Sequence, residues 1–555
     1  MIRDLATLSS TRFDVLVVGA GIHGAFIAWD AAQRGLRVAV IDAGDFGGAT
    51  SANSLKVIHG GLRYLQQVNL KRVVESIRER AVWLSIAPDL VRPMQFMVPT
   101  RGHGKEGRLA LAAAMRLNDW LGAAASRGIP VDHRIEPGGV VDRATALRLA
   151  PALVSNDFDG AAIWCDAQAA NTERLTLAAI VAAVGHGATA ANYVRCEDVR
   201  VENGKVAGAR LRDVLADASM DVEASAIVNA TGTTLRISGD REAAFVGAPP
   251  RALAVNLITR PVSQTVAFGV RSRRSGQEDP IGGGRRYLFL APWRSSALVG
   301  TFYRPWHEGD PPRVSEELIA SILDECNEAC PGLSLTRADV RRVHAGLLPL
   351  EDPRPDSNGA HARAIVSAPL LKRARIIEDS AHGGPRGLVS VFGIKYTTAR
   401  RVAEETVNVI YRTLGFSPPP CRTASAPRAL EMSSSPAVAS GPLLQGTDAG
   451  LARLGAVYGS AASAVLSDAL GRDPRAAELL APGCAVLRAE VVHAVTTEMA
   501  IRLSDVVFRR TDLASEMPPA DAALAAAADL TGSLLGWSPS KRHEETAEVR
   551  AAIQL

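Results

Sequence analysis

The sequence is poor in cysteine and in aromatic residues. Six cysteines are spread over 555 residues, and Phe, Trp and Tyr together make up 5% of the chain. Cysteines placed so far apart give no disulfide framework, which suits a reducing compartment. Only Cys326 and Cys330 lie close together, and no second pair is near enough to complete the four ligands of a zinc site. We therefore expect no metal, and interpret this pair as small residues on one face of a helix.

The sequence also lacks an excess of positive charge and a long apolar run. The 62 Lys and Arg residues nearly balance the 58 Asp and Glu, and no basic block or nucleic-acid-binding motif occurs, so nucleic acid is not an expected partner. The longest nearly uncharged stretch, residues 175–194, is broken by Gly185-His186-Gly187 and is a poor membrane span. The N-terminus shows no signal-peptide pattern. We expect a cytoplasmic protein, and peripheral attachment to the inner face of the cytoplasmic membrane stays open.

What is present is a long chain of ordinary globular composition, with 47% hydrophobic and 22% charged residues. A chain of 555 residues is too long for one hydrophobic core and predicts two to four domains. Residues 13–18 are apolar except for Asp14 and run straight into glycines, which predicts a strand buried on both faces of a parallel sheet. A helix over residues 24–34 and a second strand over residues 37–41 are expected to follow.

The turn after the first strand reads Gly19-Ala20-Gly21-Ile22-His23-Gly24, and Asp42 ends the second strand. A GxGxxG pattern alone is common, but between a buried strand and a helix it is typical of dinucleotide binding. Glycines make the tight turn, let the backbone approach a pyrophosphate and allow close helix–strand packing. The helix N-terminus favours phosphates. We therefore predict a site formed by Gly19, Gly21, Ile22, His23, Gly24 and Asp42, the last of which can accept hydrogen bonds from ribose hydroxyls.

The nucleotide fold is interrupted after its second strand, which points to a flavin rather than a nicotinamide cofactor. Helical periodicity covers residues 71–84 and 171–184, and the strand pattern resumes at 191–196, 198–201, 206–212, 221–224 and 227–232. Asn203-Gly204 is a strong hairpin turn. Residues 287–291 and 297–301 are expected to pair as antiparallel strands. Beyond the Pro- and Ser-rich stretch 417–442, the pattern is almost wholly helical, for example over residues 489–510.

Several stretches carry a family resemblance in order and spacing over nearly the whole chain. Residues 47–65 read GGATSANSLKVIHGGLRYL, residues 227–232 read IVNATG, residues 391–404 read VFGIKYTTARRVAE, and APW at 291–293 is followed by GT at 300–301. Together with RLSDVVFRRTDL at 502–513, they resemble the FAD-dependent glycerol-3-phosphate dehydrogenases and oxidases. The resemblance implies FAD as the cofactor. It also implies that Thr50, Ser51, Ser54, Cys196, Gly232, Gly393, Lys395 and Thr397 join Asp42 around it.

The resemblance implies oxidation of a CH–OH group, with glycerol 3-phosphate as the leading substrate. His59 is the candidate base for the hydroxyl proton while hydride leaves for flavin N5. The alternative is a histidine that only hydrogen-bonds the flavin or lines the wall. Arg63 either binds an anionic substrate group or ties the loop to an acidic residue. Lys395 near the flavin would stabilise its reduced anion.

The substrate side departs from the family pattern. Where the family carries Gly-Val/Ile-Arg-Pro-Leu, this chain has Leu348 in place of the arginine, and Phe302-Tyr303 and Asn256 also differ. Arg373, which matches a family arginine, and Lys395 remain as cations for an anionic substrate and are counted with His59 as candidate catalytic residues. His344 is a further candidate for substrate binding, although a core position is the alternative. The departures leave open another polyol phosphate, hydroxy acid or amine as substrate, or a flavin-bound subunit without activity.

We predict a mixed α/β protein. Its FAD-binding domain is Rossmann-like and of the D-amino-acid-oxidase type, and it is interleaved with an antiparallel-sheet substrate domain. An all-α C-terminal domain follows. The expected boundaries are 1–100, 171–245 and 351–416 for the FAD-binding parts, 101–170 for an insertion, 246–350 for the substrate sheet, 417–442 for a linker and 443–555 for the helical domain. A quinone or oxygen is expected as electron acceptor. A homodimer is left open.

Overall fold

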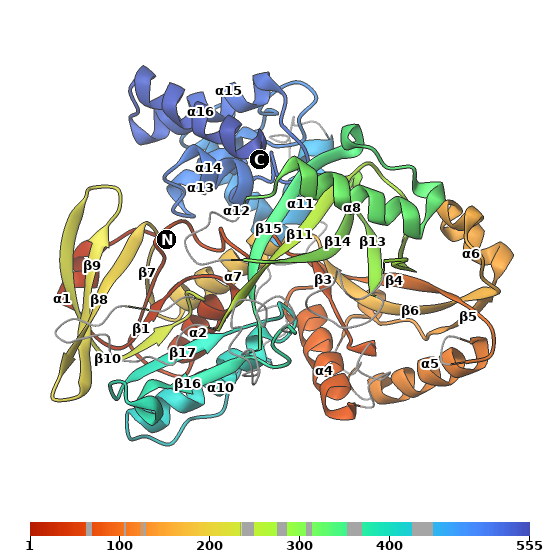
Figure 1. Cartoon of the computed structure of the whole chain (residues 1–555). Helices are drawn as coiled ribbons and strands as arrows, with labels where there is room; N and C mark the ends of the chain where they lie inside the picture. Colours follow the sequence, from red (N-terminus) through yellow and green to blue (C-terminus); the bar gives the residue numbers. More distant parts are fainter. Residues whose placement is uncertain are drawn as a thin grey trace.

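The computed structural model describes residues 1–62, 69–104, 107–123, 129–232, 249–274, 286–306, 313–351, 369–424 and 448–554, together with residues 125 and 235. Arg63 and most of the proposed linker lie outside these residues. The described part of the chain forms two sheets and a group of C-terminal helices (Figure 1).

The first sheet is mostly parallel and follows the order β16-β17-β10-β1-β2-β7. Its parallel strands are β1 (Arg12–Val18), β2 (Val38–Ile41), β7 (Thr189–Ala191), β10 (Ala218–Asn229) and β17 (Leu388–Phe392), and β16 (Arg375–Glu378) pairs antiparallel with β17. β1 and β10, which are more than 200 residues apart in the chain, thus become neighbours in one sheet. Because the strands run parallel, their carboxyl ends meet at one edge, where ligands bind in folds of this kind.

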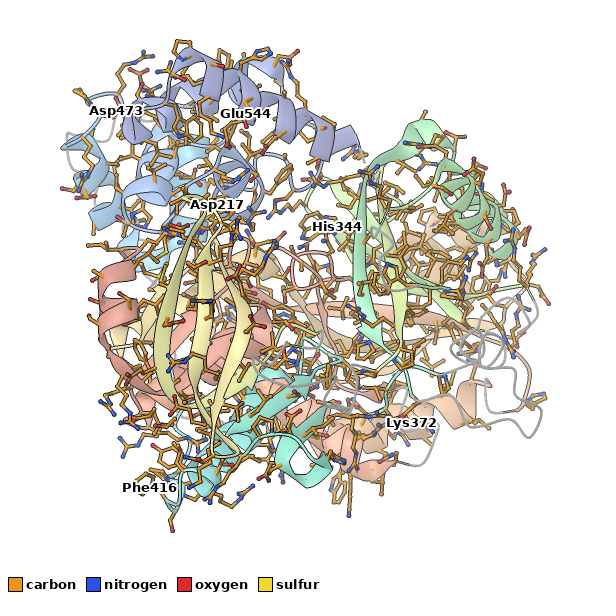
Figure 2. The ribbon with its side chains drawn as sticks, turned by 60° about the vertical axis from the view of Figure 1, so that its left-hand side comes forward. Asp217, His344, Lys372, Phe416, Asp473 and Glu544 are labelled. Atoms are coloured by element: carbon orange, nitrogen blue, oxygen red, sulfur yellow. The ribbon has the colours of Figure 1, made fainter. Side chains whose placement is uncertain are left out.

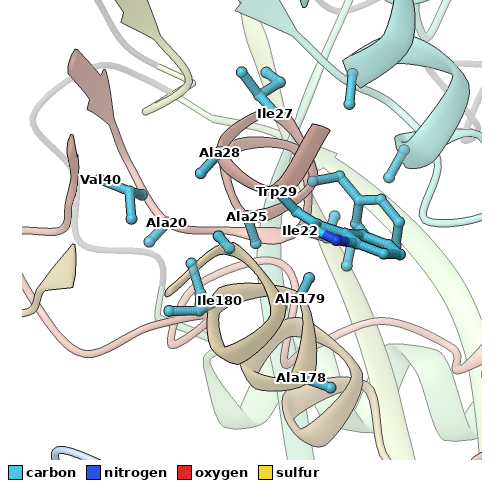
Figure 3. Packing of buried hydrophobic residues seen from close by; sticks show 14 of the residues in the cluster. Ala20, Ile22, Ala25, Ile27, Ala28, Trp29, Val40, Ala178, Ala179 and Ile180 are labelled. Atoms are coloured by element: carbon cyan, nitrogen blue, oxygen red, sulfur yellow. The ribbon is translucent and has the colours of Figure 1, made fainter. Parts of the chain in front are cut away.

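One face of this sheet is covered by three helices: α2 (Ile22–Gln33), α7 (Thr172–Gly185) and α10 (Ala399–Thr413). α2 and α7 pack closely because several side chains between them are small. Ala25 and Ala28 of α2 face Ala179 and Ile180 of α7 (Figure 3). The large indole of Trp29, by contrast, fills the space beside these small side chains (Figure 3). The predicted strand–helix–strand unit at the N-terminus is confirmed.

The other face is covered by an antiparallel hairpin, β8 (Val194–Glu202) and β9 (Lys205–Asp213), and by the short helix α1 (Leu5–Ser10). Asn203 and Gly204 both have positive φ, so the predicted hairpin turn is confirmed. Two details of the sequence-based prediction were wrong. The segment 191–196 is not one strand, because the chain turns at Tyr193, whose φ is 56°. The strands expected at 221–224 and 227–232 are one strand, β10, which continues from the hairpin into the parallel sheet.

The second sheet is antiparallel apart from the β4–β12 pair and follows the order β15-β11-β14-β13-β12-β4-β6-β3, with β5 beside β6. Its strands are β3 (Val57–Ile58), β4 (Val91–Thr100), β5 (Gly139–Asp142), β6 (Gly160–Ala169), β11 (Arg251–Thr259), β12 (Val266–Arg271), β13 (Tyr287–Trp293), β14 (Ser296–Pro305) and β15 (Val340–Pro349). The expected pairing of residues 287–291 with 297–301 is confirmed by β13 and β14.

Four helices flank the second sheet. α8 (Glu316–Ala329) and α6 (Arg143–Leu149) pack on it through an apolar cluster that contains the buried Cys326 and Cys330. Cys326 lies within α8 and Cys330 caps its end. α4 (Leu70–Ile86) and α5 (Arg108–Ala123) lie at the opposite end of the sheet from α8 (Figure 1).

The C-terminal part is helical, as predicted, and has its own apolar core. It comprises α11 (Asp448–Tyr458), α12 (Ala462–Leu470), α13 (Arg488–Thr496), α14 (Leu503–Asp505), the π-helix Val506–Arg510, α15 (Asp521–Leu535) and α16 (Pro539–Gln554). The continuous helix expected over residues 489–510 is wrong: the chain leaves the helix after Thr496, and Met499 has a φ of 59°. This break lets buried Glu498 pair with Arg174 of α7.

Among the described helices, none is by itself long and apolar enough to cross a bilayer; only the sharply bent pair 449–458 and 462–470 meets the length and composition requirement when taken together.

Candidate active site

The glycine-rich turn between β1 and α2 leaves no room for a Cβ at two of its glycines. Gly19 has a φ of 96°, and a Cβ there would lie 2.8 Å from the carbonyl of Ala230. A Cβ on Gly24 would lie 1.8 Å from the carbonyl oxygen of Gly19. These two glycines therefore allow β1, α2 and the end of β10 to close together, so that the backbone at the start of α2 can approach a ligand.

Two of the predicted cofactor residues hold this turn through hydrogen bonds. The carboxylate of Asp42 accepts from the backbone N–H of Ala20 at 2.7 Å and of Gly44 at 2.9 Å. The hydroxyl of Ser51 accepts from the N–H of Ile22, the first residue of α2, at 2.9 Å. Burial raises the pKa of Asp42, and the two N–H donors counter this shift. The structure thus brings Asp42, Ser51 and the glycine turn together.

Gly232 and Gly393 lie at the same edge of the parallel sheet as Gly19. Gly232 follows β10 and has a φ of 75°, and Gly393 follows β17. A Cβ on Gly393 would lie 2.0 Å from the ring of His23, so the imidazole packs directly on this backbone. Burial lowers the pKa of His23 to about 4, and its Nε2 is a buried atom without a hydrogen-bond partner. The carboxyl ends of four parallel strands thus converge at one edge.

His59 lies where this edge meets the antiparallel sheet. It follows β3, and its backbone N–H donates to the hydroxyl of Thr397 at 3.1 Å. The His59 side chain is 49% exposed, and its Nδ1 lies 3.8 Å from Oδ2 of Asp166. The 54–61 and 391–397 stretches, which are more than 300 residues apart, are therefore in direct contact.

Thr50 joins the cofactor loop to the substrate sheet. Its hydroxyl accepts from the N–H of Leu347 at 3.0 Å and lies 3.2 Å from the carbonyl oxygen of the same residue. A Cβ on neighbouring Gly346 would lie 3.0–3.1 Å from Thr50, so the strand presses against the loop here. Leu348 is the next residue on β15, pairs with Ala252 of β11 and is half-buried. Leu348 is thus adjacent to a residue that contacts the cofactor loop.

His344 is buried on β15, opposite Asn256 of β11 (Figure 2). Its ring meets Trp293 edge to face at 6.3 Å between centroids. Burial, together with the charges of Lys56 and Arg342, holds the pKa of His344 well below its usual value, so the imidazole is neutral. Asn256 accepts from the hydroxyl of Thr301 at 2.8 Å and donates to the carbonyl of Asn53 at 3.1 Å. Substrate binding by His344 remains a prediction.

Arg373 lines a cavity of about 380 Å³ with other basic side chains. The cavity is bounded by Asn69, Arg72, Glu351, Leu371, Lys372, Arg373, Ala374 and Arg375 (Lys372 is labelled in Figure 2). Burial and the charge of Arg373 lower the pKa of Arg72. Because Arg375 pairs with Phe392 in the β16–β17 ladder, this cavity lies close in the fold to Gly393. Arg375 is held by Glu351 at 3.1 Å.

The remaining candidates are placed as follows. Lys395 is half-buried in the loop between β17 and α10, and Thr397 of the same loop is buried. The hydroxyl of Ser54 accepts from the N–H of Lys56 at 3.2 Å. Cys196 lies in β8, two residues beyond Val194, whose N–H donates to the backbone carbonyl of Asp42 at 2.7 Å. Within the described ranges, no three His, Cys, Asp or Glu side chains could hold a metal ion.

Comparison with known proteins agrees with this geometry. Residues 14–406 match the family described as "FAD dependent oxidoreductase", and residues 441–542 match the "C-terminal domain of alpha-glycerophosphate oxidase". The chain is 30% identical over 534 residues to the glycerol-3-phosphate dehydrogenase of Synechocystis sp., covering 92% of this chain and 91% of that one. It is 31% identical to the mitochondrial enzyme of Homo sapiens over 98% of this chain and 74% of that one. The chain belongs to the family of FAD-dependent glycerol-3-phosphate dehydrogenases.

The fold of this glycerol-3-phosphate dehydrogenase family member agrees with a solved relative. The glycerol-3-phosphate dehydrogenase from Bacillus halodurans complexed with FAD superposes with a TM-score of 0.69 over 99% of this chain and 96% of that one, at 22% identity. The predicted fold is confirmed: a D-amino-acid-oxidase-type FAD domain, an antiparallel substrate sheet and a helical C-terminal domain. The chain is an FAD-dependent oxidoreductase, and the side-chain-free cradle at Gly19 and Gly24 fits a dinucleotide.

Sequence reasoning missed three polar groups that hold this site. Asp166 lies in the largely apolar strand β6, Lys56 is buried beside Glu173 at 2.9 Å, and Asp45 is buried between Arg509 and Arg510. An isolated acidic residue in an apolar strand was the available signal for Asp166. No local signal exists for the other two groups, because their partners are more than 100 positions away.

Proposed function

We propose that this enzyme oxidises the secondary hydroxyl of sn-glycerol 3-phosphate to the ketone of dihydroxyacetone phosphate. Bound FAD supplies the hydride acceptor for this reaction. The observation that carries the proposal is the position of His59 at the edge where the cofactor loops meet the substrate sheet. Its imidazole is half-exposed, and its backbone N–H is held by the hydroxyl of Thr397. As the carbon loses hydride, the hydroxyl loses a proton, and His59 is the base that takes it.

The cavity around Arg373 is the proposed site for the substrate's phosphate. Leu348 offers no donor, so the cations must come from elsewhere, and Arg72, Lys372 and Arg373 line one cavity. Guanidinium groups bind phosphate oxygens through short, charge-assisted hydrogen bonds. Lys395, in the loop beside Gly393, is proposed to stabilise negative charge on the reduced cofactor.

Leu348 also supports a second candidate, a divergent family member that oxidises another polyol phosphate, a hydroxy acid or an amine. An isobutyl group at this position of β15 removes a bidentate anion contact and favours a substrate with less charge on that side.

Anaerobic titration of the FAD-loaded protein distinguishes these functions. Bleaching of the flavin absorbance by glycerol 3-phosphate, and not by glycerol or lactate, supports the first function. Bleaching by another alcohol or an amine alone establishes the second. A flavin that only dithionite reduces would indicate a subunit without this activity.

The electron acceptor is proposed to be a quinone, since the curated relatives named above are dehydrogenases. A lipid-soluble acceptor requires contact with a membrane, and α5 offers a surface for it. Leu109, Leu117 and Trp120 of α5 are 86%, 40% and 72% exposed, while Leu111 and Met115 face the interior. A surface helix normally has one apolar face, which packs on the protein. The exposed face formed by Leu109, Leu117 and Trp120 is a second apolar face, and it needs a partner that covers it.

We propose that an anionic lipid surface covers this face of α5. Arg108 and Arg116 on the same helix are exposed. Residues 101–134 contain six Lys or Arg and three Asp or Glu, so this segment carries most of the chain's formal net charge of +4. Basic residues beside exposed Leu and Trp are typical of helices that lie in the lipid interface.

A further inference from the structure

The carboxylate of Asp166 is buried at the centre of a set of donors. Asp166 lies in β6, where Cys165 and Ala167 on either side are also buried. Its Oδ1 accepts from the backbone N–H of Gly60 at 2.6 Å and from Nη1 of Arg80 at 2.5 Å. Its Oδ2 accepts from the indole N–H of Trp164 at 3.3 Å and faces Nδ1 of His59 at 3.8 Å.

Gly60, the residue after His59, is shaped by this arrangement. A Cβ on Gly60 would lie 2.2 Å from Nη1 of Arg80 and 2.6 Å from Oδ1 of Asp166. The residue must therefore be glycine for the backbone to reach the carboxylate. Because Gly60 is held from one side and the N–H of His59 is held by Thr397, the backbone on both sides of the imidazole is fixed.

The surroundings keep Asp166 ionised. Burial alone would raise the pKa of Asp166, but the neighbouring His59 imidazole, the charge of Arg80 and the Gly60 N–H lower it overall. Two titratable side chains face the carboxylate: Arg80, from α4, and His59, from the loop after β3. Arg80 bonds to Oδ1, so Oδ2 faces only the indole N–H of Trp164 and the imidazole of His59 among the contacts described above.

We propose that Asp166 is a positioning residue that holds His59 with its proton on Nδ1 and leaves Nε2 free to accept the proton of the substrate hydroxyl. This inference rests on the proposed function, in which His59 is the base. The separation of 3.8 Å is longer than a hydrogen bond, and the proposal is that this contact shortens to a hydrogen bond in the substrate complex. An ionised carboxylate beside one ring nitrogen fixes the tautomer and stabilises the imidazolium that forms.

The test is a double-mutant cycle on flavin reduction, measured by anaerobic stopped flow with glycerol 3-phosphate on FAD-loaded protein. Asp166→Asn has the same shape and keeps an oxygen for Gly60 and Arg80, but presents an N–H₂ group to His59, which would put the proton on Nε2. We expect flavin reduction to slow by ~10² or more near neutral pH. The flavin spectrum and FAD content, read in the same samples, report whether the variant is folded.

The His59→Ala background separates a positioning role from a structural one. If Asp166 acts through His59, Asp166→Asn should slow the His59→Ala enzyme by less than about twofold. Equal slowing in both backgrounds would overturn the positioning role and leave the base assignment standing. A His59→Ala enzyme as fast as wild type would instead overturn the base itself, and the positioning role with it. Asp217→Asn, at an exposed turn (Figure 2), is the matched control and should change nothing.

Discussion

The carboxylate of Asp45 and the guanidinium of Arg510 form two hydrogen bonds, of 2.7 and 2.9 Å, although 465 positions separate them in the chain. Both side chains are fully buried. Arg509 and Asn192 donate to the same carboxylate at 2.5 and 3.0 Å. Asp45 lies three residues beyond Asp42, in the turn that follows β2. The C-terminal helical domain therefore holds the loop that carries the proposed ribose ligand.

Replacing Arg510 is expected to destabilise the protein strongly. Removing one partner of a buried ion pair leaves the other charge in the interior and typically costs about 3–5 kcal/mol. We expect Arg510→Met to lower the free energy of unfolding by an amount of this order in urea unfolding of the FAD-loaded protein. It should also weaken FAD binding, because the turn at Asp42 loses its anchor.

The control for this variant is Arg550→Met, which breaks the exposed pair with Asp521. Exposed pairs contribute little, so its unfolding midpoint and FAD affinity should match those of the wild type. Equal effects of the two substitutions would contradict a special role for the buried pair.

The stability of the protein should depend on pH through His23. Burial lowers the pKa of His23 to about 4 in the folded protein, whereas the unfolded chain titrates near 6.5. Between these two values the unfolded state binds one more proton, so stability is fully present above pH 6.5 and is lost as the pH falls toward 4. This group alone should remove about 2 kcal/mol between pH 7.5 and pH 5.

His23→Gln isolates that contribution. The variant has no group to titrate at this position, so its unfolding free energy should fall less than that of the wild type over the same pH range. Urea unfolding at pH 7.5 and pH 5 measures the difference. His186→Gln, on an exposed histidine after α7, should retain the wild-type slope. A His23→Gln slope equal to that of the wild type would show that His23 takes up its proton at the same pH in both states.

The predictable part of the fold follows from local patterns. β1, α2 and β2 could be derived from residues 13–41, because a buried parallel strand and a glycine turn leave few alternatives. The break at residues 497–502 could not. The helical periodicity runs through it, yet the chain leaves the helix there and Glu498 pairs with the buried Arg174. Tertiary ion pairs of this kind have no local signature.

The same distinction applies to the candidate site. Asp42 was predicted as a site residue from the strand–glycine–helix–strand pattern, and Ser51 and His59 from the stretch that carries the family resemblance. The structure brings Asp42 and Ser51 to the start of α2. Asp166 was missed, although it contacts the N–H next to His59, because β6 joins this place only through sheet pairing with β3.

Arg373→Gln tests where the anionic end of the substrate binds. A hydrogen-bonded cation that holds phosphate is worth about 1.5–3 kcal/mol, so kcat/KM for glycerol 3-phosphate should fall roughly 10- to 100-fold. The kcat/KM for glycerol, which has no phosphate, should change little. Arg200→Gln, on β8 and away from the cavity, should leave both values unchanged. An equal fall for both substrates would place Arg373 outside the phosphate site.

Substitutions on α5 test the membrane proposal independently of catalysis. Leu109→Ser with Trp120→Ser removes the two most exposed apolar side chains of the helix. Burying one such side chain in the lipid interface is worth on the order of 1.5 kcal/mol, so partitioning onto vesicles of phosphatidylglycerol and phosphatidylcholine should fall by ~10-fold or more. Binding to purely phosphatidylcholine vesicles should be weak for every variant, because the arginines then have no anionic headgroups to meet.

The control for α5 is Phe416→Ser, which removes an aromatic side chain that is 63% exposed and lies across the molecule from Lys372 (Figure 2). It should bind vesicles as the wild type does, since exposure alone does not produce attachment. Light scattering on the same samples measures the molar mass of the wild type and of the α5 variant, and so separates lipid binding from self-association. If the wild type is a dimer and the α5 variant a monomer, and vesicle binding is the same for both, then a second copy of the chain covers this face rather than lipid. A loss of vesicle binding without a change in mass would establish α5 as the lipid-facing surface.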